Sequence, residues 1–126
     1  MNDLELDALV AEHVFGWTIC RDGDGQLAGI DAPRGFPPDV ESKCIGRLVP
    51  SYSTDGNHML AVIEKMRERD WLASVTLRIC GERVEDERMQ FEAEFRQWRD
   101  WWAYDPSAPR AVAIAALKVL GVEVSP

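Results

Sequence analysis

Two glutamates and a histidine are the residues best suited by type to acid–base chemistry. Glu92 and Glu94 stand two apart in an alternating stretch, so both would project from one face of a strand. Paired carboxylates act as acid and base where an enclosing cleft separates their pKa values. A surface charge ladder with Arg78 and Arg96 is the simpler interpretation. A small hydrolase or transferase using Glu92, Glu94 or His58 is the alternative.

Three adjacent polar residues, Ser53, Thr54 and Asp55, also suggest catalysis, but the same residue types are typical of helix N-terminal caps. We expect Ser53 to cap a helix and Asp55 to lie in its first turn, where the helix dipole favours negative charge. His13 is expected on the buried face of the first helix as a packed core residue. The sequence contains no G-x-S-x-G nucleophile motif and no glycine-rich phosphate loop before a helix.

An aromatic cluster is the strongest candidate for a functional surface. Its members are Trp98, Arg99, Trp101, Trp102 and Tyr104. Trp, Tyr and Arg are the residues enriched at the energetic centres of protein interfaces, and one short segment cannot bury four aromatic side chains. We expect two of the tryptophans to pack under the last helix and the cluster to bind a protein. The alternatives are that all four belong to the core, or that they stack on single-stranded nucleic acid.

Charge and length limit the remaining classes. The 126 residues suit one domain, 1–126, and the net charge of −8 argues against nucleic-acid binding, which needs a basic field. No apolar run approaches the length of a membrane span. Acidic residues stand where a signal peptide would carry Lys or Arg, so we expect a cytoplasmic protein.

The sequence suggests neither a metal nor a cofactor. Three cysteines, Cys20, Cys44 and Cys80, lack a C-x-x-C pair and are expected as free thiols. The Asp22–Gly25 segment begins like a calcium loop, but Leu27 and Pro33 occupy the positions that need Gly and Glu. A hairpin turn is the better interpretation.

Apolar periodicity predicts three helices. The first begins at Asn2 or Asp3, runs for about ten residues and ends before Gly16, with Asp7 off its apolar face. The second runs from about Thr54 to Arg69 with apolar residues at helical spacing. The third is capped by Ser107 and stopped by Gly121, and 122–124 is expected as an edge strand.

Alternating patterns predict two hairpins. The first joins 17–21 to 26–30, and the second pairs 71–80 with 89–96, placing one apolar face against the helices. Prolines and a glycine in 31–49 argue against regular structure there, although a short strand at 44–49 stays open.

Three stretches, in order, carry a family resemblance. Glu5–Glu12 leading to Phe15-Gly16-Trp17, then Pro50–Asp55, then Ala108–Leu117, resemble the recurring segments of the phage ABA sandwich domain family. The resemblance implies a small phage or prophage protein, in a bacterial host, with a sheet between helical layers. The family supplies no established activity and no catalytic residues.

These observations predict an α+β fold of order α-β-β-α-β-β-α, with antiparallel strands in one sheet packed against three helices. The resemblance implies helices on both faces of that sheet. The expected function is that of a small acidic phage or prophage accessory protein, a non-catalytic module that binds another protein. Inhibition of a host protein is one way it could act. The alternatives to this function are the small hydrolase or transferase described above and a homo-oligomeric structural module.

Overall fold

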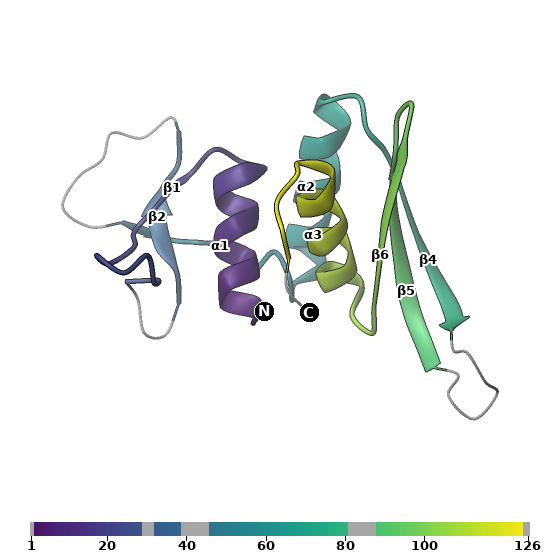
Figure 1. The fold of residues 1–126 in the computed structure, drawn as a ribbon, viewed down its shortest axis with the longest axis horizontal. Helices are drawn as coiled ribbons and strands as arrows, with labels where there is room; N and C mark the ends of the chain where they lie inside the picture. Colours follow the sequence, from purple (N-terminus) through teal and green to yellow (C-terminus); the bar gives the residue numbers. More distant parts are fainter. Residues whose placement is uncertain (1, 29–31, 39–45, 81–87, 125–126) are drawn as a thin grey trace.

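The computed structural model describes residues 2–28, 32–38, 46–80 and 88–124, which form an α+β fold. Figure 1 shows its layers: a small sheet, then helix α1, then helices α2 and α3, and a larger sheet at the other end. The helices and strands, in chain order, are α1 (Asp3–His13), β1 (Thr18–Ile19), β2 (Arg34–Phe36), β3 (Arg47–Leu48), α2 (Gly56–Glu68), β4 (Leu72–Cys80), β5 (Arg88–Arg96), β6 (Asp100–Asp105) and α3 (Ala108–Val119).

The α+β class is confirmed, and the arrangement of the sheets differs from expectation. Strands β1-β2-β3 and β4-β5-β6 form two separate antiparallel sheets instead of one. Among the described residues, helices cover one face of the β4–β6 sheet and the other face is open (Figure 1). The expected sheet between helical layers is therefore replaced by helical layers between two sheets.

Local sequence signals set the helix ends. At the start of α1, the Asn2 side chain accepts from the Glu5 amide at 2.8 Å. After its end, Gly16 has φ +75°, a left-handed conformation that glycine adopts without strain. Gly121, at φ +77°, likewise follows α3. The cap of α2 is Asp55 and not Ser53, because Asp55 Oδ1 accepts from the amides of Asn57 and His58.

The larger sheet confirms the predicted pairing of the two alternating runs. Val75 lies opposite Ala93 and Leu77 opposite Phe91, and β6 adds a third strand from the aromatic segment, for which no element was predicted. Phe95 is 1% exposed against the helices, and small residues of α3 such as Ala113 allow close approach. Val75 faces the same side, yet it is 37% exposed because it lies on an edge strand.

The smaller sheet corrects the expectation for 31–49. Strand β2 forms there, because Gly35 lets β1 approach: a Cβ at Gly35 would lie 2.6 Å from the Thr18 carbonyl oxygen. The open question at 44–49 is answered by β3 over its described part, while 39–45 lies outside the described residues. Over the described residues, the first predicted hairpin is reduced to one bridge between Arg21 and Leu27, and its residues 29–30 lie outside the described part of the chain. Residues 122–124 are not a strand.

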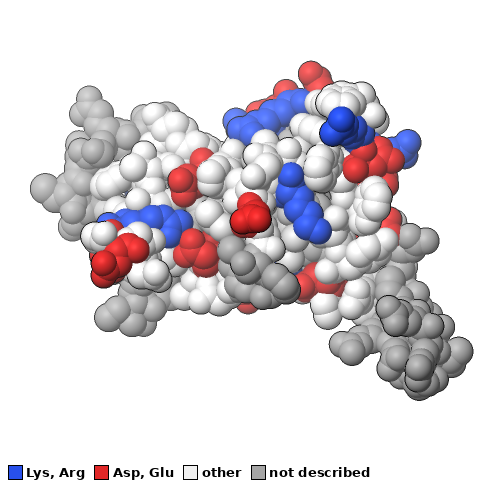
Figure 2. Space-filling view, viewed as in Figure 1, with Lys and Arg blue, Asp and Glu red and all other residues white. Residues whose placement is uncertain are grey.

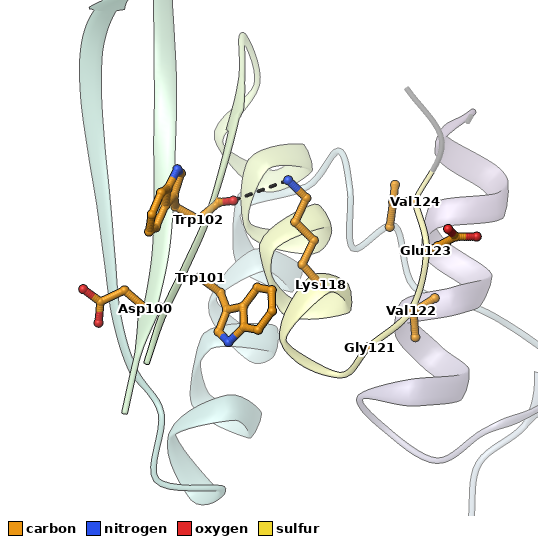
Figure 3. A pocket seen from close by; sticks show the side chains of 8 residues that line it. All are labelled: Asp100, Trp101, Trp102, Lys118, Gly121, Val122, Glu123 and Val124. Atoms are coloured by element: carbon orange, nitrogen blue, oxygen red, sulfur yellow. Dashed lines mark hydrogen bonds between the residues drawn. The ribbon is translucent and has the colours of Figure 1, made fainter. Parts of the chain in front are cut away.

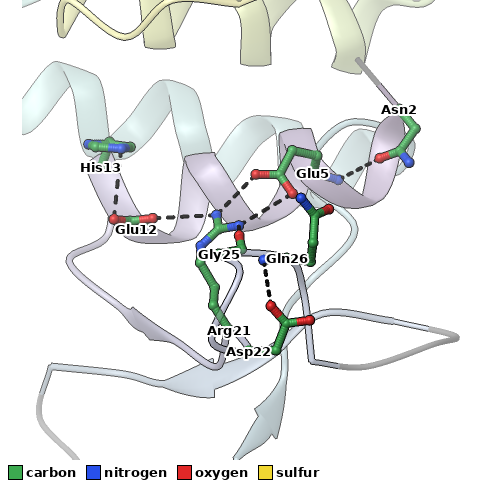
Figure 4. A network of polar contacts seen from close by, with 8 residues as sticks. All are labelled: Asn2, Glu5, Glu12, His13, Arg21, Asp22, Gly25 and Gln26. Carbon is green, nitrogen blue, oxygen red and sulfur yellow. Dashed lines mark hydrogen bonds and ion pairs between the residues drawn. The ribbon is translucent and has the colours of Figure 1, made fainter.

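A polar network ties the turn at 22–25 to α1. Arg21 Nη2 lies 3.0 Å from Glu5 Oε1 and 3.7 Å from Glu12 Oε2, and its Nη1 donates to the Gly25 carbonyl oxygen at 3.1 Å (Figure 4). His13 lies at the edge of this network, 4.0 Å from Glu12, with its side chain 38% exposed. The expectation that His13 is a core residue is therefore wrong, since α1 turns this position toward solvent.

No helix in the described part of the chain is both long enough and apolar enough to cross a membrane.

Candidate functional site

The aromatic segment forms the β5–β6 hairpin, and its tip is fixed to the helical layer. The Gln97 amide donates to the Arg99 carbonyl oxygen at 3.0 Å, and Gln97 Nε2 donates to the Arg69 carbonyl oxygen after α2 at 3.0 Å. Trp98, at the tip, is 78% exposed. The Arg99 guanidinium lies 4.4 Å from the centre of its ring, a cation–π contact. The tip thus presents a supported indole to solvent.

The alternation of β6 distributes the other aromatic side chains between the two faces of the sheet. Trp101 lies opposite Phe95 on the helix side, whereas Trp102 lies opposite Glu94 and Tyr104 opposite Glu92 on the open side. The prediction of two tryptophans beneath the last helix is therefore wrong for one of them, because adjacent residues of a strand point in opposite directions. The three β6 aromatics are 37% (Trp101), 49% (Trp102) and 44% (Tyr104) exposed.

A pocket of about 680 Å³ lies between β6 and the end of α3 (Figure 3). The Trp101 indole points toward the end of α3 from one side, and Val122 and Val124 line the other. Lys118 Nζ donates to the Trp102 carbonyl oxygen at 3.5 Å across the edge of β6. The pocket has an aromatic wall and apolar valines, and the charged residues Asp100, Lys118 and Glu123 also line it. Such a lining suits an apolar side chain with a polar neighbour.

The charges around the hairpin are mixed. Arg96 lies 3.7 Å from Glu94 and 3.8 Å from Asp100, and its side chain is 60% exposed, so these pairs contribute little to stability. Acidic and basic side chains are interspersed over the described part of the face in Figure 2. The hairpin surface is therefore aromatic with a polar rim, the composition typical of a protein interface.

The residues proposed for acid–base chemistry do not meet. Glu92 and Glu94 lie on the open face of the sheet, and His58 lies on α2 on the other side, 6.0 Å from Tyr52 between ring centres. None of the three lines the pocket beside β6. The His58 Nδ1 atom is buried and has no hydrogen-bond partner in the described part of the chain. The arrangement gives no shared site for proton transfer.

A buried polar cluster joins α1 to the segment before α2. Asp7, predicted off the apolar face of α1, is 4% exposed, and its Oδ1 accepts from the Ser53 amide at 2.8 Å and from Ser53 Oγ at 2.7 Å. Burial raises the pKa of Asp7 above 3.8, and the two hydrogen bonds from Ser53 partly oppose that rise. The partners are 46 residues apart in sequence, so no local pattern indicated the contact.

Tyr52 completes this cluster. Its ring stacks on Phe15 with 4.8 Å between centres, and burial together with the charge of Asp7 raises the pKa of Tyr52 to about 12. Ser53 Oγ donates to a carboxylate and not to a histidine, so the serine is not activated as a nucleophile. The cluster holds α1 against the start of α2.

Metal-ligand residues do not converge in the described part of the chain. Cys20 is a partly exposed free thiol there, and Cys44 and the side chain of Cys80 lie outside the described residues.

Comparison with solved structures connects this fold to a phage protein. A crystal structure of a phage protein from Bacillus cereus ATCC 14579 superposes with a TM-score of 0.67 and 17% sequence identity, covering 99% of this chain and 93% of that chain. No protein-family model and no curated protein matches the sequence. The likeness supports the fold of a phage protein, and it does not extend to the named sandwich family.

Proposed function

We propose that this chain is a non-catalytic phage or prophage accessory protein that binds another protein through the β5–β6 hairpin. The observation that carries the proposal is the exposure of Trp98, 78%, at a tip held by hydrogen bonds, with Trp102 and Tyr104 half exposed on the adjoining strand. Exposed aromatic side chains on a rigid element lose little entropy on binding, which is why they anchor interfaces.

The fold shared with a phage protein supports the setting, and the acid–base alternative loses support because its residues lie apart. In this proposal the protein works in the cytoplasm of a bacterial host and modulates or inhibits a host protein. Trp98, Arg99, Trp101, Trp102 and Tyr104 form the binding surface.

The test is quantitative affinity capture from host lysate with matched variants. Trp98→Ala and Trp102→Ala should each reduce the yield of a captured partner at least about tenfold, as expected for residues at the energetic centre of an interface. The control is Leu48→Ala, which truncates a 56% exposed side chain on β3 in the other sheet. A partner retained equally by all variants would exclude the hairpin as the binding surface.

A further inference from the structure

The long edge of β4 is the unprotected part of this fold. In the described part of the chain β4 pairs with β5 alone, so its other side is a free strand edge. From Leu72 to Leu77 it contains no charge, proline or glycine, the devices that normally protect an edge from pairing. By contrast, Lys118 blocks part of the β6 edge, and β1 and β3 have only two residues each.

The direction of the β4 backbone groups follows from the ladder. Lys118 donates to the Trp102 carbonyl oxygen from the side away from β5, so the backbone groups of Trp102 and of its opposite residue Glu94 point away from each other. Glu94 therefore bonds across to Ser74 on β4. Since alternate residues point to opposite sides, Ala73, Val75 and Leu77 direct their N–H and C=O groups to the open edge.

We propose that a second copy of this chain pairs antiparallel with this edge, Val75 opposite Val75 of the second copy. A two-fold axis at Val75 places Ala73 opposite Leu77 and Ser74 opposite Thr76. Every outward-pointing backbone group of these residues then meets a partner, and the two sheets continue into one of six strands. Apolar residues meet on the helix side, and hydroxyl residues meet on the open side, both favourable cross-strand pairs.

The side chains of this edge are complementary to the same edge of a second copy. Leu77 is 50% exposed and Ala73 is small, so each leucine projects beside the alanine of the other copy. Ala73 borders a pocket of about 290 Å³ that is also lined by Ile63 and Trp71, on the side to which Leu77 of the second copy projects. The chain carries a net charge of −8, so like-charge repulsion opposes its association in general, whereas none of the five residues paired at this edge is charged.

The interface is small. Pairing five residues of each edge buries less surface area than the roughly 1,200 Å² of a standard interface. Self-association is therefore weak and depends on concentration. Sedimentation equilibrium from about 1 to about 500 μM should show a monomer–dimer equilibrium. Val75→Lys places two ammonium groups opposite each other and should raise the dissociation constant at least about tenfold. The control Leu60→Lys, on exposed α2 surface, should leave it within about twofold.

A second variant tests the register and does not depend on destabilising the edge. Paired Val75 residues have Cα atoms roughly 5.5 Å apart, within the range that a disulfide spans, so Val75→Cys should cross-link under mild oxidation. Thr76→Cys should cross-link far less, because Thr76 lies opposite Ser74. Wild-type protein treated in parallel measures the background from Cys20, Cys44 and Cys80.

The outcomes separate the edge from the aromatic hairpin. Loss of the dimer in Val75→Lys together with cross-linking of Val75→Cys supports the proposal. A monomer at every concentration, or a dimer that Val75→Lys leaves intact and Trp98→Ala dissociates, overturns it. The proposal does not rest on the binding function assigned to the hairpin.

Discussion

Replacing Asp7 should expose the cost of a buried carboxylate that holds two helices together. Asp7→Ala removes the acceptor of two hydrogen bonds from Ser53, which is itself 1% exposed. The Ser53 amide is then left without this acceptor, whereas Ser53 Oγ can still donate to the Asp3 carbonyl oxygen at 3.3 Å. An unsatisfied buried donor costs about 1–3 kcal/mol, so the free energy of unfolding should fall by about 2 kcal/mol. Asp7→Asn keeps an acceptor of the same shape and should change it by about 1 kcal/mol or less at pH 7.

The raised pKa of Asp7 also predicts the direction in which stability changes with pH. Burial raises the pKa of Asp7 above its unfolded value of 3.8, so the folded state binds the proton more tightly than the unfolded chain. The contribution of this group to stability is therefore fully present below pH 3.8 and is lost as the pH rises through the raised pKa. Relative to Asp7→Asn, the wild type should gain stability as the pH falls through that interval.

Urea denaturation followed by tryptophan fluorescence, between about pH 4 and pH 7, measures both variants against the wild type. The difference between wild type and Asp7→Asn cancels the titration of the other carboxylates, which the two proteins share. A loss of less than about 1 kcal/mol in Asp7→Ala would refute the proposed role of the carboxylate. So would a stability difference between wild type and Asp7→Asn that falls on acidification. A falling difference would mean that the folded state prefers the ionised carboxylate.

Two further predictions concern the helix cap and the tight strand pairing, both measured by urea denaturation. Asp55→Ala should lower the free energy of unfolding by about 1 kcal/mol, because the Asp55 side chain accepts from two amides of α2. The control Ser107→Ala should change it by less than about 0.5 kcal/mol, since Ser107 makes no side-chain cap hydrogen bond. Gly35→Ala should cost about 2 kcal/mol, because its Cβ would lie 2.6 Å from the Thr18 carbonyl oxygen, while the control Gly23→Ala meets nothing within 4 Å. Equal effects within either pair would contradict the local explanation.

Much of the fold follows from local pattern. Helical spacing predicted α2 to within two residues at each end, and period-two alternation predicted β4, β5 and their antiparallel pairing. These signals are strong because a half-buried helix or strand repeats its apolar residues with its own period. Gly16 and Gly121 were predicted to end their helices, and both have positive φ, a conformation that glycine adopts more freely than any other residue.

The candidate site was only partly predictable. The composition of the aromatic segment indicated an interface, but which tryptophan faces the helices depended on its being a strand, and its mixed aromatic pattern predicted no element. The separation of Glu92 and Glu94 from His58 likewise depended on which face of the sheet the helices cover. The function proposed for the hairpin stays a prediction.

The sequence by itself determined the elements whose signals lie within one helix or strand, because backbone periodicity and capping act over a few residues. Only the tertiary structure decided the contacts between distant segments. Asp7 meets Ser53 across 46 residues, β2 forms because Gly35 admits β1, and two sheets form where one was expected. The physical reason is burial, which decides whether a carboxylate is a surface charge or a core acceptor. The burial of a residue depends on the assembled chain and not on the residues next to it in sequence.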